Sequence, residues 1–234
     1  MKHSLRVLLE HLIDYAGLFP PAALSMEDAV RNYARYREGE HAFALGKFVV
    51  PAARAHEVPS NFPLSILGID EVKEIEGAAP GAFVESTDLD AIARAGLRAK
   101  IRTGGVTPDA FPSTESVAQF IRACKEKGIA FKATAGLHHP VRCVKPLTYE
   151  PDAPTGTMHG FLNVFLAALF VDDTEEILRE TDPRAFVFTD EGVRWRDHFA
   201  STDEIARMRR DFAMSFGSCS FEEPIEDLKE LRFL

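Results

Sequence analysis

Short apolar runs alternate along the chain with stretches whose apolar residues recur at helical spacing. The clearest unit lies in the middle, where residues 98–103 and 129–135 form two strand-like runs. Between them, residues 113–127 carry apolar side chains on one helical face, and Gly128 provides a stop for the helix. Because a parallel crossover needs an intervening helix, this order predicts a parallel sheet.

Eight runs have the length and composition of strands. They cover residues 12–17, 44–51, 64–68, 81–86, 98–103, 129–135, 185–189 and 212–220. Eight strand–helix units in a chain near ~250 residues predict an α/β fold, a single (β/α)8 or TIM barrel over residues 1–234. A flavodoxin-like open sheet is the alternative, but it would leave several strands unplaced.

Three segments depart from a regular barrel. Residues 1–10 predict an extra N-terminal helix before the first strand, and residues 189–195 predict a hairpin that makes the seventh unit irregular. Residues 139–158 contain four prolines and no periodicity, so they predict one long loop after the sixth strand. In a barrel this loop would lie at the C-terminal face, where active sites are found.

Composition narrows the class of protein. The formal net charge of −9 argues against a nucleic-acid partner, and the hydrophobic fraction of 46% is typical of a globular domain. No apolar stretch reaches the length of a membrane span, and the N-terminus lacks a secretory pattern, so we expect a cytoplasmic protein without a membrane partner. The three cysteines form no CxxC pair and are expected to be reduced. The sequence does not decide whether the chain forms a homo-oligomer.

Several charged residues lie where a barrel places its chemistry, at strand C-termini and in the following loops. Asp14 and Glu85 are candidate bases or metal ligands, with a capping or strand-end role as the alternative for each. Lys47 shares one strand face with Val49, and the sequence does not decide whether that face is interior. Lys132 lies inside an apolar run, where a lysine has few structural roles besides an ion pair with Glu85. A lowered pKa would make Lys132 nucleophilic towards carbonyls.

Two further segments suggest anion binding. Arg102 precedes Thr103, Gly104 and Gly105, and a guanidinium beside glycine amides can hold a carboxylate or phosphate. An ordinary loop is the alternative. At the end of the last strand, the hydroxyls of Ser218 and Ser220 precede a helix, and helix N-termini bind anions. A simple capping serine is the alternative there.

Histidines bracket the long loop. His138 and His139 precede it, His159 follows it, and Asn163 is an isolated polar residue in the apolar helix beyond. Adjacent histidines point in different directions, so His138 and His139 are not expected to bind one metal together. Histidines gathered at one end of a barrel favour acid–base or metal chemistry over purely structural roles.

Two short motifs invite a comparison with a known family. They are Arg102-Thr103-Gly104-Gly105 and Lys132-Ala133-Thr134-Ala135-Gly136. The segment that contains them, residues 98–136, resembles the class I aldolase barrels of the deoxyribose-phosphate aldolase type. In this resemblance Arg102 takes the position of the Schiff-base lysine, although it cannot form an imine, and Lys132 takes that of the assisting lysine. The resemblance implies the barrel more than the reaction.

The leading hypothesis is an aldolase-like or lyase-like enzyme whose substrate is a small carbonyl compound bearing a carboxylate or phosphate. Lys132 would form an imine with the carbonyl group or polarise that group, and Arg102 with the glycine amides would hold the anion. Lys47, Asn163 and the two serines are further candidates for substrate contacts. Glu85 or Asp14 would transfer the proton, assisted by His138 or His159.

Two other classes stay open. One is a metal-dependent hydrolase or isomerase, with Glu85, His138 and His159 as ligands of a divalent metal. The other is a non-catalytic protein that binds a small molecule. The expected cofactor is therefore none or a divalent metal.

Overall fold

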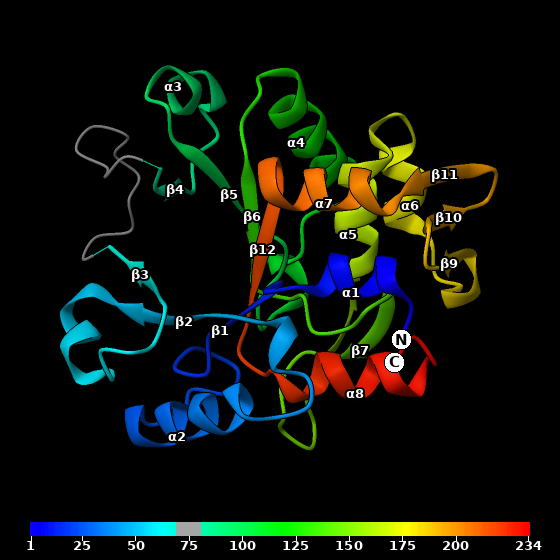
Figure 1. Ribbon diagram of the computed structural model, residues 1–234. Helices are drawn as coiled ribbons and strands as arrows, with labels where there is room; N and C mark the ends of the chain where they lie inside the picture. Colours follow the sequence, from blue (N-terminus) through cyan, green and yellow to red (C-terminus); the bar gives the residue numbers. More distant parts are fainter. Residues whose placement is uncertain (69–80) are drawn as a thin grey trace.

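The computed structural model describes residues 1–68 and 81–234, and its main element is a seven-stranded parallel sheet. The strand order is β3-β2-β1-β12-β6-β5-β4. The sheet is curled into a half-barrel, with β3 and β4 at its two edges (Figure 1). The strands are β1 (Ile13–Tyr15), β2 (Leu45–Pro51), β3 (Leu64–Leu67), β4 (Phe83–Val84), β5 (Arg98–Arg102), β6 (Phe131–Thr134) and β12 (Ala213–Ser218).

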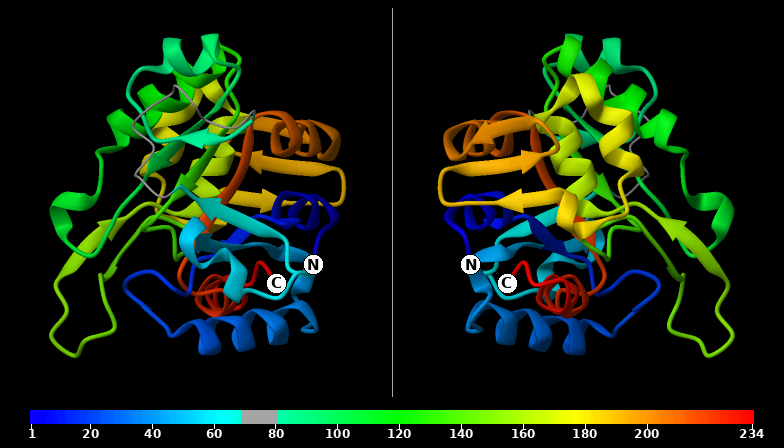
Figure 2. Two further views of the ribbon diagram at one scale, coloured as in Figure 1. Left: turned by 90° about the vertical axis from the view of Figure 1, so that its left-hand side faces the viewer. Right: turned by 90° about the vertical axis from the view of Figure 1, so that its right-hand side faces the viewer.

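Helices follow most of these strands and lie around the outside of the curled sheet (Figure 2). Serine side chains begin three of them, because the hydroxyls of Ser25, Ser113 and Ser201 accept backbone N–H groups of the first turn. The α-helices are α1 (His3–Leu9), α2 (Met26–Arg37), α3 (Leu89–Arg94), α4 (Thr114–Glu126), α5 (Phe161–Leu169), α6 (Thr174–Arg179), α7 (Thr202–Asp211) and α8 (Glu222–Glu230). The 3₁₀ helices are η1 (Ala42–Ala44), η2 (Ala52–Glu57), η3 (Pro108–Ala110), η4 (Val171–Asp173) and η5 (Pro183–Ala185).

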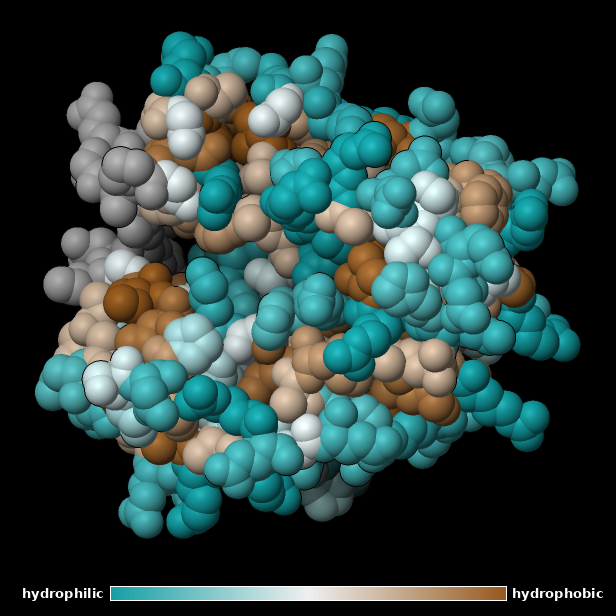
Figure 3. Space-filling model, in the orientation of Figure 1, coloured by the Kyte–Doolittle hydropathy of each residue, from teal (hydrophilic) through white to brown (hydrophobic). Residues whose placement is uncertain are grey.

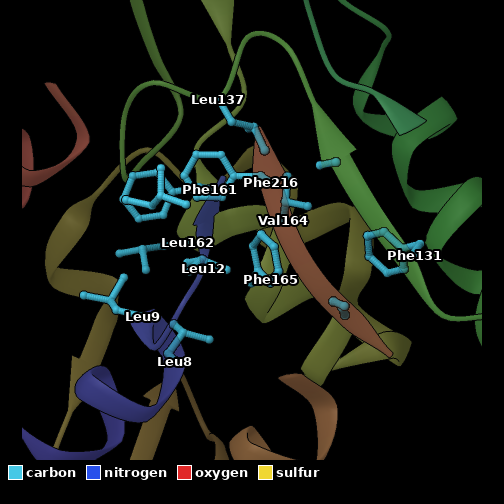
Figure 4. Packing of buried hydrophobic residues seen from close by; sticks show 14 of the residues in the cluster. Leu8, Leu9, Leu12, Phe131, Leu137, Phe161, Leu162, Val164, Phe165 and Phe216 are labelled. Atoms are coloured by element: carbon cyan, nitrogen blue, oxygen red, sulfur yellow. The ribbon is translucent and has the colours of Figure 1, made fainter. Parts of the chain in front are cut away.

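The core lies on the convex side of the sheet. The ring centroid of Phe216 in β12 is 5.1 Å from that of Phe161 and 6.1 Å from that of Phe165, both in α5 (Figure 4). Phe131 and Ala133 of β6 are also fully buried. Because side chains alternate along a strand, the residues between these core positions face the concave side. This alternation decides where the charged residues of the sheet point.

The barrel prediction is confirmed in part. Seven of the eight predicted strands join the parallel sheet, in the order that a barrel would have. The run at 185–189 instead forms β9 (Phe186–Phe188), which pairs antiparallel with β10 (Gly192–Trp195) and, through it, with β11 (His198–Ser201). The short hairpin satisfies its backbone locally, and β12 pairs directly with β6. The described residues form no closed eight-stranded barrel.

Two of the irregular segments are confirmed and one prediction is wrong. The N-terminal helix is α1, and the hairpin over 189–195 joins β9 to β10. The segment 139–158 is not a structureless loop, because it contains the antiparallel pair β7 (Cys143–Pro146) and β8 (Thr155–Met158). Pro140 precedes this pair, Pro146 ends β7, and Pro151 and Pro154 lie in the turn, where fewer ladder N–H groups are needed.

Two features of the structure concern contact with a membrane: the hydropathy of the surface, and the length and polarity of the helices. On the face shown in Figure 3, apolar residues form groups interrupted by hydrophilic ones. In the described part of the chain, every helix is too short or too polar to cross a membrane.

Candidate functional site

A buried lysine occupies the concave face of the half-barrel. Lys132 lies between the core residues Phe131 and Ala133 of β6, so its side chain points the other way. Its Nζ donates to Asp14 Oδ2 of β1 at 2.8 Å and to Ser65 Oγ of β3 at 3.2 Å. Only 6% of Lys132 is exposed. The sequence left open an ion pair with Glu85, but the structure gives Asp14 as the partner.

The curl of the sheet brings these residues together. Four strand steps separate β6 from β3, and in a flat sheet they would put the two strands about 19 Å apart. The contact between Lys132 and Ser65 therefore spans the half-barrel. The Lys132 Nζ also lies 5.5 Å from the ring centroid of Phe83 in β4, at the other edge of the sheet. The lysine is thus enclosed by strands from both edges.

Three donors hold Asp14. Its Oδ2 accepts from Lys132 and from Ser215 Oγ at 2.9 Å, and its Oδ1 accepts the backbone N–H of Lys47 at 2.9 Å. Gly46 allows this close approach, because a Cβ at that position would lie 2.5 Å from Asp14 Oδ1. Asp14 is 3% exposed. A desolvated pair of this kind depends on both partners, since either charge alone would be left uncompensated.

A second charged group follows along the same face. Lys100 is the register partner of Lys132 in β5, and its Nζ lies 3.0 Å from Glu85 Oε2. Arg102 Nε donates to Glu85 Oε1 at 3.1 Å. Burial raises the pKa of Glu85, but the hydrogen bonds and charges of the two cations outweigh it and lower the pKa below its ordinary value. Glu85 is therefore ionised at neutral pH, and Arg102 keeps an exposed side chain.

The predicted anion-binding loop, Thr103 to Gly105, packs against neighbouring parts of the protein. Thr103 is fully buried and donates to the carbonyl of Ala135 at 2.6 Å. A Cβ at Gly104 would lie 2.4 Å from the ring of Phe111, and one at Gly105 would lie 2.7 Å from Ala110 Cβ. These glycines make room for η3 and the residue after it, which is the ordinary-loop alternative.

Lys47 contacts the Lys132–Asp14 pair only through its backbone, and Ser218 and Ser220, at the end of β12 and beyond it, form hydrogen bonds elsewhere. Lys47 contributes its backbone N–H to Asp14, while its side chain is exposed. Ser220 Oγ accepts the backbone N–H of Glu223 at 3.1 Å, which is the capping role, and Ser218 Oγ accepts from the N–H of Ser220 at 3.4 Å. Ser65, Ser215 and Phe83 belong to the Lys132 surroundings without having been predicted.

Asn163 and His159 form hydrogen bonds with backbone groups of segments distant in the chain. Asn163 is fully buried, donates to the carbonyls of Ile177 and Glu180, and accepts from the N–H of Arg142 at 2.9 Å. His159 Nε2 lies 2.8 Å from the carbonyl oxygen of Pro112. Burial lowers the pKa of His159, and the charge of Arg142 acts in the same direction, against the Pro112 hydrogen bond. These contacts support a structural role for both residues.

The predicted metal ligands are not brought into one group. Glu85 binds the two cations of β5, His159 binds Pro112, and His138 Nδ1 lies 2.9 Å from Glu223 Oε2 of α8. In residues 1–68 and 81–234, no set of three or more His, Cys, Asp or Glu side chains is placed to hold a metal ion. His138 instead lines a cavity beside α8.

Comparisons with models of known protein families, with curated proteins and with solved structures give no match for this chain. Its function must therefore be inferred from the residues of the half-barrel and their geometry.

Proposed function

We propose that the chain is a lyase-like enzyme in which the Lys132 amine attacks a small anionic carbonyl compound. The observation that carries the proposal is the ion pair between Lys132 and Asp14, 2.8 Å apart and buried on the concave face. An ammonium group must lose a proton before it can attack a carbonyl carbon. Asp14 lies within hydrogen-bond distance to accept that proton directly.

The covalent steps balance without a cofactor. The Lys132 nitrogen bonds to the carbonyl carbon, and the carbonyl oxygen leaves as water once it is protonated. As the bond between the α and β carbons breaks, its electron pair converts the protonated imine into an enamine, and the β carbon leaves as an aldehyde after its hydroxyl group has lost a proton. Protonation of the enamine at the α carbon gives the product imine, and hydrolysis of that imine restores the lysine. Ser215 and the N–H of Lys47 hold the Asp14 carboxylate in place during these steps.

The charges of the concave face favour an anionic substrate. Lys132, Lys100 and Arg102 provide three cations, whereas Asp14 and Glu85 provide two carboxylates. The excess of positive charge suits a substrate with one carboxylate or phosphate group. Arg102 is the most accessible of these cations, with 54% of its side chain exposed. Its guanidinium can take such a group through two parallel hydrogen bonds.

Borohydride trapping tests the proposal. The full chain is incubated with small 2-oxo acids and phosphorylated aldehydes, reduced with borohydride, and analysed by intact mass and peptide mapping. We expect a reduced adduct on Lys132. Lys132→Met should lose this adduct, and Lys127→Met, a control at an exposed lysine paired with Asp90, should keep it. An unmodified wild-type protein, or an adduct that persists in Lys132→Met, would refute the proposal.

A further inference from the structure

A cavity of about 270 Å³ lies between the β7–β8 hairpin and α8. His138 and His139, which follow β6, form one wall of the cavity. Glu223 and Asp227 of α8 form a second wall, and Lys145 and residues 146–149 of the hairpin form the third. None of the residues that line the cavity belongs to the Lys132 cluster, so a ligand site in this cavity does not depend on the proposed function.

Each histidine is paired with a carboxylate through the same ring nitrogen. His138 Nδ1 lies 2.9 Å from Glu223 Oε2, and His139 Nδ1 lies 2.5 Å from Asp227 Oδ2. Burial raises the pKa of Glu223, but the hydrogen bond from His138 and the charges of both histidines outweigh it and lower the pKa. An ionised carboxylate only accepts hydrogen bonds, so Nδ1 carries the proton. Nε2 of each ring is then left to form a hydrogen bond with a ligand.

These two Nε2 atoms have no hydrogen-bond partner among the described residues, although His138 is only 7% exposed and His139 only 5%. They are not sealed in the protein. Among the described residues, Nε2 of His41 is the side-chain nitrogen or oxygen atom that is fully buried and has no hydrogen-bond partner, and the Nε2 atoms of His138 and His139 do not share that condition. The Nε2 atoms of His138 and His139 therefore retain contact with solvent, and the cavity is the space that both rings line.

The spacing of the rings argues against a shared metal ion. Two nitrogens bound to one tetrahedral zinc at about 2.1 Å lie about 3.4 Å apart. The ring centroids of His138 and His139 are 6.4 Å apart, which leaves their nitrogens about 4 Å apart even if they point at each other. The two Nε2 atoms can instead contact separate groups of one ligand.

The charge and the walls of the cavity define the ligand further. Glu223 and Asp227 disfavour an anion, and the Lys145 ammonium disfavours a cation. A neutral ligand with several hydroxyl groups can form a hydrogen bond with each Nε2 atom, because a hydroxyl group both donates and accepts. Its carbon atoms can pack on Met158 and Pro21. The volume lies just below the usual range for ligand pockets, about 300–1,000 Å³, and suits a molecule the size of one sugar ring.

We propose that this cavity binds a neutral sugar or polyol, whose hydroxyl groups form hydrogen bonds with the Nε2 atoms of His138 and His139. The site lies where β6 and β12 end, at the C-terminal edge of the sheet, which is the usual place for ligands in parallel α/β folds.

Calorimetric titration of the full chain tests this site with D-glucose, D-xylose, sorbitol and myo-inositol. Inorganic phosphate and putrescine serve as the anionic and cationic comparisons. We expect saturable binding of at least one neutral compound. His139→Phe, which keeps an aromatic ring but removes the ring nitrogens, should weaken binding about tenfold, or about 1.4 kcal/mol. His56→Gln, at an exposed histidine outside the cavity, should leave the affinity unchanged.

A measurement on the unsubstituted protein guards against a folding defect in His139→Phe. The side-chain ¹⁵N resonances of His138 and His139 should move as the sugar or polyol saturates the protein, and that of His56 should not. Binding of phosphate or putrescine alone, or of no neutral compound with a Kd below about 10 mM, would overturn the proposal. So would polyol binding that leaves both resonances in place.

Discussion

The buried pair of Lys132 and Asp14 predicts a large energetic coupling between two residues 118 positions apart in the chain. Lys132→Met removes the ammonium but leaves the Asp14 carboxylate almost fully buried. Removing one partner of a buried ion pair typically costs about 3–5 kcal/mol. Because Ser215 and the N–H of Lys47 still donate to Asp14, we expect the lower end, about 3 kcal/mol.

The reverse change should cost more. Asp14→Asn leaves the Lys132 ammonium with Ser65 and the face of Phe83 as neighbours, so about 4 kcal/mol is expected. In the double variant neither charge is left alone. Its cost should therefore fall short of the sum of the two single costs by at least about 1.5 kcal/mol.

Urea denaturation followed by circular dichroism at pH 7 measures these free energies of unfolding. The exposed pair of Lys127 and Asp90 is a matched control, and its cycle should give a coupling below about 1 kcal/mol. If the costs at Lys132 and Asp14 add to within about 0.5 kcal/mol, the two groups do not interact as the structure has them.

Two further predictions concern structural residues. His159 has a pKa lowered by burial, so the unfolded chain binds its proton more readily, and stability that is complete above pH 6.5 should decline as the pH falls below that value. His159→Gln should flatten this part of the stability profile, and an unchanged slope in urea denaturation would contradict the assignment. Gly104→Ala should cost about 1–3 kcal/mol, because its Cβ would lie 2.4 Å from the Phe111 ring. Gly39→Ala meets nothing closer than 3.5 Å and should cost less, and equal losses in thermal unfolding would refute the packing argument.

The sequence predicts which segments form strands better than it predicts whether those strands close into a barrel. Alternating apolar runs are local, so the eight strand segments could be found from the sequence. Sheet membership depends on partners far away in the chain. The run at 185–189 has the composition of a barrel strand, yet the short connection to β10 gives it a nearer partner. Similarly, proline counts in 139–158 indicated an irregular segment, although Cys143–Pro146 and Thr155–Met158 pair across the turn between them.

The candidate site was predicted one residue at a time, and the structure supplies the pairings. An isolated lysine in an apolar strand indicated Lys132, and a carboxylate in the first strand indicated Asp14. Nothing in the sequence shows that these two meet, because the contact depends on the register of β1, β12 and β6. Ser65 and Ser215 carry even less signal, since a serine in a strand is common on either face.

The Lys132–Asp14 pair and the two histidine–carboxylate pairs differ in which atom each leaves free to contact a ligand. At Lys132 the amine is tied to Asp14, and it becomes a nucleophile only after the proton moves along that hydrogen bond. At His138 and His139 the carboxylates contact Nδ1, so Nε2 of each ring is left to contact a ligand. The first arrangement suits a covalent step that begins when a carbonyl group arrives. The second suits reversible recognition of hydroxyl groups, and the two sites can therefore be tested independently with an oxo acid and a neutral sugar.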